Sequence, residues 1–119
     1  MTSWRIETTT QFESARRWYE KKRPDELAAV LNNLGRYFSL LNNAINAACV
    51  QAGYLHHESQ GIVALDQKGG KPNLQETRFY LYPHQRTQVV YLITIGNKSE
   101  QHDDILLAKR FVDSLTGAP

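Results

Sequence analysis

Apolar side chains recur every three or four residues from position 27 to position 48, the longest regular pattern in the chain. This spacing places them on one face of a helix. Pro24, Asp25 and Glu26 make a favourable first turn, because proline has a helical φ and acidic side chains suit the positive end of the helix dipole. The pattern therefore predicts a long helix over residues 24–48 with one buried face.

A shorter helix is predicted just before it, over residues 10–23. Its apolar residues repeat at helical intervals, and Thr10 and Glu13 have the spacing of a capping box. The helix is expected to end at Arg23, because the residue before a proline is pushed out of helical geometry. Since almost nothing connects the two helices, they are expected to form an antiparallel hairpin on one side of a sheet.

The other regular segments have the two-residue period or the β-branched density of strands. They predict strands over residues 4–8, 61–65, 77–82 and 88–95. Turns at residues 68–73 and 83–86 indicate antiparallel hairpins, and residues 51–60 are interpreted as a loop. A last apolar stripe from position 105 to 115 predicts a small C-terminal helix that begins near Ser99. This order predicts an α+β fold, with a short N-terminal strand and a helical hairpin packed on a mostly antiparallel sheet.

Length, charge and cysteine content narrow the class of protein. The 119 residues suit one domain, over residues 1–119, that can bury a single core. The net charge of +2 permits nucleic-acid binding without arguing for it. The single cysteine, Cys49, lies in an alanine-rich helical run, where a free thiol is expected to be buried. No apolar run has the length of a membrane span and no signal peptide opens the chain, so we expect a soluble, cytoplasmic protein without a membrane partner.

The most informative stretch joins the last strand to the closing helix. Residues 96–105 read Gly-Asn-Lys-Ser-Glu-Gln-His-Asp-Asp-Ile. Gly96 breaks the strand, Lys98 stands at the corner, and Ser99 can cap the helix. Gln101, Asp103 and Asp104 are expected to cap and orient the helix start. The stretch resembles the Gly-Gly-Asp-Lys-Ser-x-Gln-x-x-Asp-Ile run that ends the C-terminal strand of RelE/ParE toxins in the addiction-module killer protein subgroup.

The resemblance covers most of the chain. In that subgroup a Gly-Val-x-Glu-Leu-Arg strand and a Tyr-Arg-Val-Tyr strand precede the junction, and residues 61–66 and 77–80 lie at the matching places. RelE/ParE toxins of type II toxin–antitoxin modules have a short N-terminal strand, a helical hairpin, an antiparallel meander and a small C-terminal helix. The resemblance implies this RelE/ParE-like fold. Asp66 stands where the subgroup usually has arginine, so an acid occupies the place of a phosphate-binding cation.

The resemblance also implies an activity. RelE-type toxins cut messenger RNA on the ribosome without a metal, which requires groups that move protons and cations that stabilise the phosphate. The implied catalytic set is Arg78, Lys98 and His102, and the RNA-binding set is Arg86, Tyr80 and Tyr91. Arginine would bind phosphate, and tyrosine would bind phosphate or stack on a base. The resemblance implies no cofactor.

Each candidate also has a structural interpretation. Arg78 and Lys98 can be solvated charges, and His102 can be a surface residue of the closing helix. The basic residues between positions 16 and 23 form either a solvated helix face or a contact with RNA or the ribosome. His56 and His57 offer only two potential ligands and no accompanying cysteine, so no metal site is expected.

Two functional hypotheses remain. The first is a toxin that acts as a ribosome-dependent endoribonuclease, with ribosome and messenger RNA as partners. The second, favoured by Asp66, is a non-catalytic member: a gyrase inhibitor of the ParE type, or a degenerate toxin-fold protein that only binds a partner. Either toxin implies a cognate antitoxin, which is a segment that folds on binding or a helix-turn-helix protein that represses the operon. The sequence leaves the target and the oligomeric state open.

Overall fold

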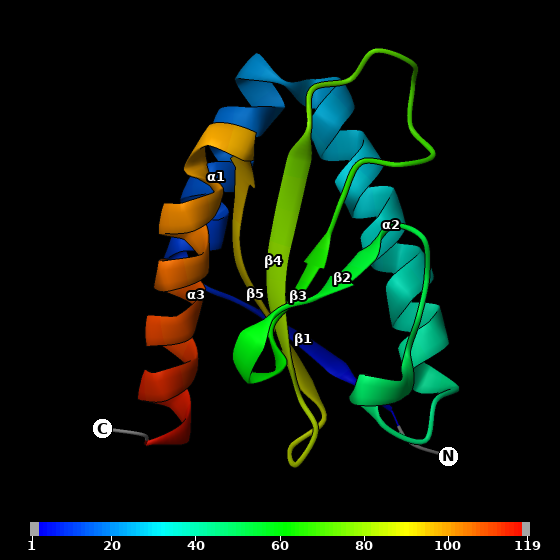
Figure 1. Ribbon diagram of the computed structural model, residues 1–119, viewed down its shortest axis with the longest axis vertical. Coiled ribbons are helices and arrows are strands. Elements are labelled where there is room, and N and C mark those ends of the chain that lie inside the picture. The colour runs from blue at the N-terminus through cyan, green and yellow to red at the C-terminus, as the bar shows by residue number, and fades with distance from the viewer. Residues whose placement is uncertain (1–2, 118–119) are drawn as a thin grey trace.

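The computed structural model of the protein describes residues 3–117, which form a five-stranded sheet with helices on both faces (Figure 1). The strands are β1 (Arg5–Thr8), β2 (Leu55–His57), β3 (Val63–Leu65), β4 (Thr77–His84) and β5 (Val89–Asn97). The helices are α1 (Thr10–Lys22), α2 (Pro24–Asn42) and α3 (Gln101–Thr116), with short 3-10 helices η1 (Ala47–Cys49), η2 (Ser59–Gly61) and η3 (Lys98–Glu100). The predicted α+β class, with its N-terminal strand and C-terminal helix, is confirmed.

The strands lie in the order β1-β5-β4-β3-β2. Strand β1 runs parallel to β5, and the other three pairs are antiparallel. Strand β1 is short and pairs only with the first part of β5, as far as Leu92. Within residues 3–117, no strand therefore covers the outer edge of β5 at residues 94–97. Residues 94–96 are nevertheless buried, because α1 packs against β5 beside the junction that the sequence singles out.

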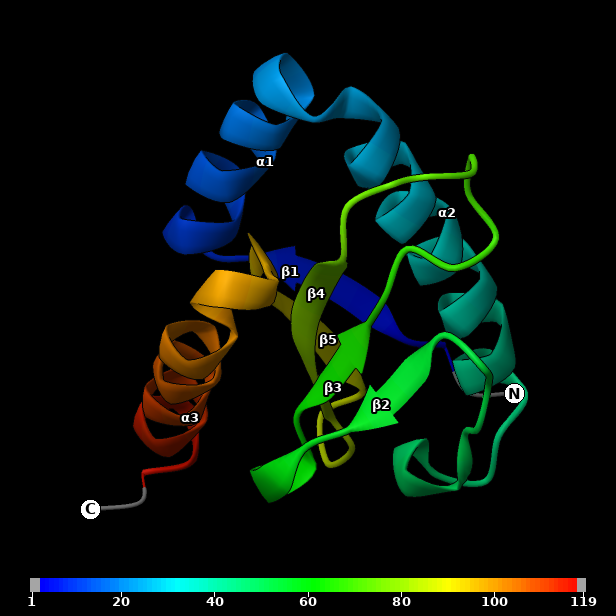
Figure 2. The same ribbon diagram turned by 45° about the horizontal axis from the view of Figure 1, so that its top comes forward.

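The two faces of the sheet bury separate cores, because successive residues of a strand point to opposite sides. Helices α1 and α2 cover one face, where Phe12 stacks on Phe79 with ring centroids 5.3 Å apart. Helix α3 covers the other face, where Ala108 and Val112 pack in one cluster with Tyr80. Figure 2 shows α1 and α2 meeting at one end and diverging over their face of the sheet. Helix α3 thus covers the face of the sheet that α1 and α2 leave exposed.

Helix α2 ends at Asn42, earlier than the predicted end at position 48. The side-chain amides of Asn42 and Asn43 donate hydrogen bonds to the carbonyl oxygens four residues before them. Such local bonds compete with the helical backbone and favour a helix end. Ile45, which the apolar pattern assigned to the buried face, is 93% exposed. The prediction of a helix up to position 48 was therefore wrong.

Two further predictions fail just after α2. The predicted loop over residues 51–60 contains β2, which aligns His56 with Ala64 of β3 at the sheet edge. A strand of this length is too short to show an alternating pattern in the sequence. Cys49 is exposed in η1 rather than buried. The helical face that was expected to bury it does not exist, because α2 has already ended.

Candidate functional site

The turn from β5 into α3 is held by a capping box. The Asn97 side-chain oxygen accepts hydrogen bonds from the Glu100 backbone N–H at 3.1 Å and from the Ser99 hydroxyl at 2.7 Å. In return, the Glu100 carboxylate accepts the Asn97 backbone N–H at 3.0 Å. Asn97 is therefore the cap, in place of the predicted Ser99. These reciprocal bonds fix the direction in which the Lys98 and Glu100 side chains leave the turn.

The structure brings two of the three predicted catalytic residues together. Arg78 lies opposite Gly96 in the pairing of β4 with β5. Its Nη2 is 3.5 Å from one Glu76 carboxylate oxygen, and Lys98 Nζ is 3.9 Å from the other. The Arg78 side chain is largely buried, and its Nε has no hydrogen-bond partner. Both predicted cations thus share one carboxylate, which sequence reasoning did not single out.

His102, the third predicted catalytic residue, is exposed in the first turn of α3. Among residues 3–117, no hydrogen bond or ion pair involves its imidazole. A general base needs a fixed position to abstract a proton efficiently. The structure therefore places His102 near the junction but gives it no partner that would orient its ring.

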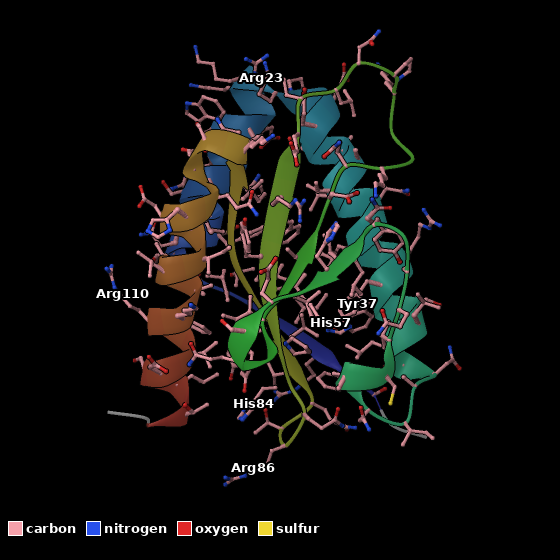
Figure 3. The ribbon with its side chains drawn as sticks, viewed as in Figure 1. Arg23, Tyr37, His57, His84, Arg86 and Arg110 are labelled. Atoms are coloured by element: carbon pink, nitrogen blue, oxygen red, sulfur yellow. The ribbon has the colours of Figure 1, made fainter. Side chains whose placement is uncertain are left out.

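The predicted RNA-binding residues are dispersed. Tyr80 is fully buried in the core under α3, so its ring cannot stack on a base in this conformation, and that assignment is corrected. The Tyr91 ring packs against Phe111 with centroids 5.4 Å apart. Arg86 is exposed in the turn between β4 and β5, at the opposite end of the molecule from Arg23 (Figure 3). Six strand residues, 79–84, lie between Arg78 and the turn that holds Arg86, which is about 20 Å along β4.

A groove of about 350 Å³ lies between α1 and the junction. Helix α1 lines it with Trp18 and Tyr19, and the junction lines it with Glu100 and Asp104. The Asp104 carboxylate lies directly over Gly96, where a Cβ atom would collide with it. Gly96 does not break the strand as predicted, because β5 continues to Asn97, but it provides the space in which this carboxylate sits.

Asp104 is in an unfavourable environment for a negative charge. Burial, and then the charges of Glu100 and Asp103, raise the pKa of its carboxyl to about 6. Its Oδ2 is buried and has no hydrogen-bond partner. Burial, followed by Glu100 and Asp104, likewise raises the pKa of Tyr19 to about 12. Asp103 and Asp104 lie in the first turn of α3, as expected for acids at the positive end of a helix dipole. Capping by Asp104 was wrong, because its carboxylate lines the groove and accepts no hydrogen bond from a helix N–H group within residues 3–117.

Asp66, which departs from the toxin pattern, has partners of its own. Its carboxylate lies 2.7 Å from His56 Nε2 and accepts the Lys68 backbone N–H at 2.8 Å. The other histidine of the tandem, His57, bonds through Nε2 to the Val50 carbonyl oxygen at 2.8 Å. Within residues 3–117, no group of three or more histidine, cysteine, aspartate or glutamate side chains is arranged to hold a metal ion. Asp66 therefore forms a structural contact between β2 and the end of β3.

A scan against protein-family models and searches of curated proteins and of solved structures found no match to this chain. The resemblance to RelE/ParE toxins therefore rests on the junction residues and the order of elements. None of the helices between residues 3 and 117 has the length and apolar character needed to cross a membrane.

Proposed function

We propose that this chain is a non-catalytic member of the RelE/ParE kind, which acts by binding another protein. The charge of the junction carries the proposal. Glu76 lies beside both candidate cations, and the charges of Glu100 and Asp103 lie close enough to Asp104 to help raise its pKa, after the larger effect of burial. Carboxylates thus outnumber the cations Arg78 and Lys98 at this end of the sheet.

The charge balance matters because RNA cleavage places a crowded, negatively charged phosphate at the site. Such a phosphate is stabilised by cations that are free to face it, and it is repelled by carboxylates. A protein partner, by contrast, can supply basic side chains that complement the carboxylates. The unpositioned His102 and the buried Tyr80 also leave the implied endoribonuclease without an oriented base and without one of its two implied tyrosines. These observations favour binding over catalysis.

Tightly controlled expression in bacteria tests the proposal. We expect growth arrest with intact transcripts, because the protein would block a partner without cutting RNA. Supercoiling assays with purified gyrase then separate a ParE-type inhibitor from a protein that binds another partner. The proposal fails if transcripts are cleaved at ribosome-bound positions, or if expression leaves growth unchanged.

A ribosome-dependent endoribonuclease is the second candidate, and the burial of Arg78 favours it. Its Nε is buried without a partner, so the guanidinium retains hydrogen-bonding capacity for a ligand. The nearby Lys98 is 77% exposed, and exposed ion pairs such as Lys98–Glu76 are worth about 0–1 kcal/mol, which a phosphate can displace. In this case Arg78→Gln and Lys98→Gln would abolish transcript cleavage, whereas Arg110→Gln on the exposed surface of α3 would not.

Under either proposal the natural partner set includes a cognate antitoxin. Such an antitoxin silences the toxin by covering its working surface, through a segment that folds on binding or through a helix-turn-helix protein. Ribosome and messenger RNA are further partners only for the endoribonuclease. Toxin–antitoxin modules act inside the cell, so we place the protein in the cytoplasm as part of the same proposal.

A further inference from the structure

The groove between α1 and the junction contains polar groups whose hydrogen-bonding capacity is unused. Tyr19 is only 4% exposed and lines the groove, and none of the hydrogen bonds within residues 3–117 engages its hydroxyl. On the junction side, Asp104 Oδ2 is buried and also has no partner. Trp18, beside them, is 52% exposed and meets Tyr19 edge-on with ring centroids 5.0 Å apart. A hydroxyl, a carboxylate and an open indole therefore face one space.

The charge of this space is negative and uncompensated. Among residues 3–117, neither Glu100 nor Asp104 forms an ion pair with a lysine or arginine. Arg23 is the one cation that affects the ionisation of Tyr19, and its effect is smaller than that of either carboxylate. A group that carries positive charge and several N–H donors would complement the groove.

The size and lining of the groove indicate what kind of molecule carries that group. Thr94, Ile95 and Asn97 of β5 line it opposite α1, and Thr94 and Ile95 are only 7% and 4% exposed, so no added strand can pair with β5 there. The groove, at about 350 Å³, has room for one long side chain rather than for a helix. Its negative charge and exposed indole complement a cationic side chain on the surface of a partner protein.

We infer that this groove binds the arginine side chain of a partner protein, inserted from the surface of that partner. The planar guanidinium would stack on the Trp18 indole and donate hydrogen bonds to Asp104 and Glu100. Arginine suits the site better than lysine, because its flat fork can stack and bond to a carboxylate at the same time. The inference rests on the proposed function, since it names the chemistry by which the binding protein recognises its partner.

Nuclear magnetic resonance titration of the full-length ¹⁵N-labelled chain tests the inference, with N-acetyl-arginine amide as the probe. We expect saturable shifts of the Trp18 indole N–H and of the Gly96 and Asn97 amides, with a dissociation constant of about 1–10 mM. N-acetyl-citrulline amide has nearly the same shape without the charge, and should bind about tenfold more weakly. Spermidine serves as the probe for a free organic cation.

Variants identify the groups responsible. Asp104→Asn and Trp18→Ala should each weaken binding of the arginine amide by about tenfold. Asp103→Asn is the matched control, because Asp103 is exposed and does not line the groove, and it should change binding by less than about twofold. Equal binding of arginine and citrulline, unchanged binding by the Asp104 variant, or tighter binding of spermidine than of the arginine amide would each overturn the inference.

The outcome separates this inference from the proposed function. If the wild-type chain arrests growth but does not bind arginine, the proposed function is retained and the groove is not its binding site. If the chain binds arginine but does not arrest growth, the groove is an arginine-binding site and the toxin function is wrong. If both hold, Trp18→Ala should relieve growth arrest more than Asp103→Asn does.

Discussion

Replacing Asp104 with asparagine should stabilise the folded protein at neutral pH. The carboxyl pKa rises from 3.8 to about 6 on folding, because burial and the charges of Glu100 and Asp103 oppose ionisation. The unfolded chain therefore loses this proton at a lower pH than the folded chain does. The free energy of unfolding falls as the pH rises from about 4 to about 6, and above about pH 6 the whole destabilisation from the ionised Asp104 is present.

The magnitude follows from the two pKa values. Each pH unit between them corresponds to about 1.4 kcal/mol, so ionisation of Asp104 costs the fold at most about 3 kcal/mol. The side chain is partly exposed, and solvent screening lowers this figure. We expect Asp104→Asn to raise the free energy of unfolding by about 1–2 kcal/mol at about pH 7.5, and to leave it unchanged at about pH 3.5, where both states are protonated.

Urea unfolding followed by tryptophan fluorescence measures this difference, and the dependence of the free energy on urea should be the same for both proteins. Asp103→Asn is the matched comparison, because it removes one repelling charge but leaves the Asp104 carboxyl in place. It should give a smaller gain. The reasoning is refuted if the Asp104 variant is less stable than the wild type at about pH 7.5, or if its gain is equally large at about pH 3.5.

Three further predictions concern the same fold. Gly96→Ala should lower the free energy of unfolding by about 1–3 kcal/mol, because the new Cβ atom displaces the Asp104 carboxylate. Gly35→Ala should raise it by about 0.5–1 kcal/mol, because its Cβ atom contacts no other group and alanine favours the helix. Equal effects of the two variants in urea unfolding would contradict this. Asn97→Ala should cost about 1 kcal/mol by removing the capping box, and unchanged hydrogen exchange at the start of α3 would argue against it. Cys49 should react with Ellman's reagent in the native protein, and reaction only on unfolding would show a buried thiol.

Local patterns were sufficient for most of the secondary structure. In α1, α3 and the long strands, apolar residues repeat along the sequence because the side chains on one face of each element are buried. The repeat is three to four residues in a helix and two in a strand. The errors fall where local hydrogen bonds compete with that pattern. Thr9 caps α1 in place of Thr10, and the Asn42 and Asn43 side chains end α2 before its apolar repeat is complete. Strand β2 escaped prediction because it is too short to show a period.

The candidate site was less predictable, because its residues come from distant parts of the chain. The sequence pointed to Arg78 and Lys98, and the pairing of β4 with β5 does bring them to one end of the sheet. It assigned Tyr80 to an RNA surface, since an alternating strand does not reveal which face a later helix covers. It gave no indication of Glu76 as the carboxylate that both cations approach.

By itself, the sequence determined the α+β class, the order of the elements apart from β2, and a strand-to-helix junction near residues 96–101, because each depends on the properties of neighbouring residues. The strand does not end at the predicted Gly96 but continues to Asn97. Only the tertiary structure decided the character of the site. Packing of α1 beside the start of α3 creates the groove that joins Trp18 and Tyr19 to Asp104. Burial within that groove then makes the Asp104 charge costly, and burial is a property of the assembled layers rather than of any segment.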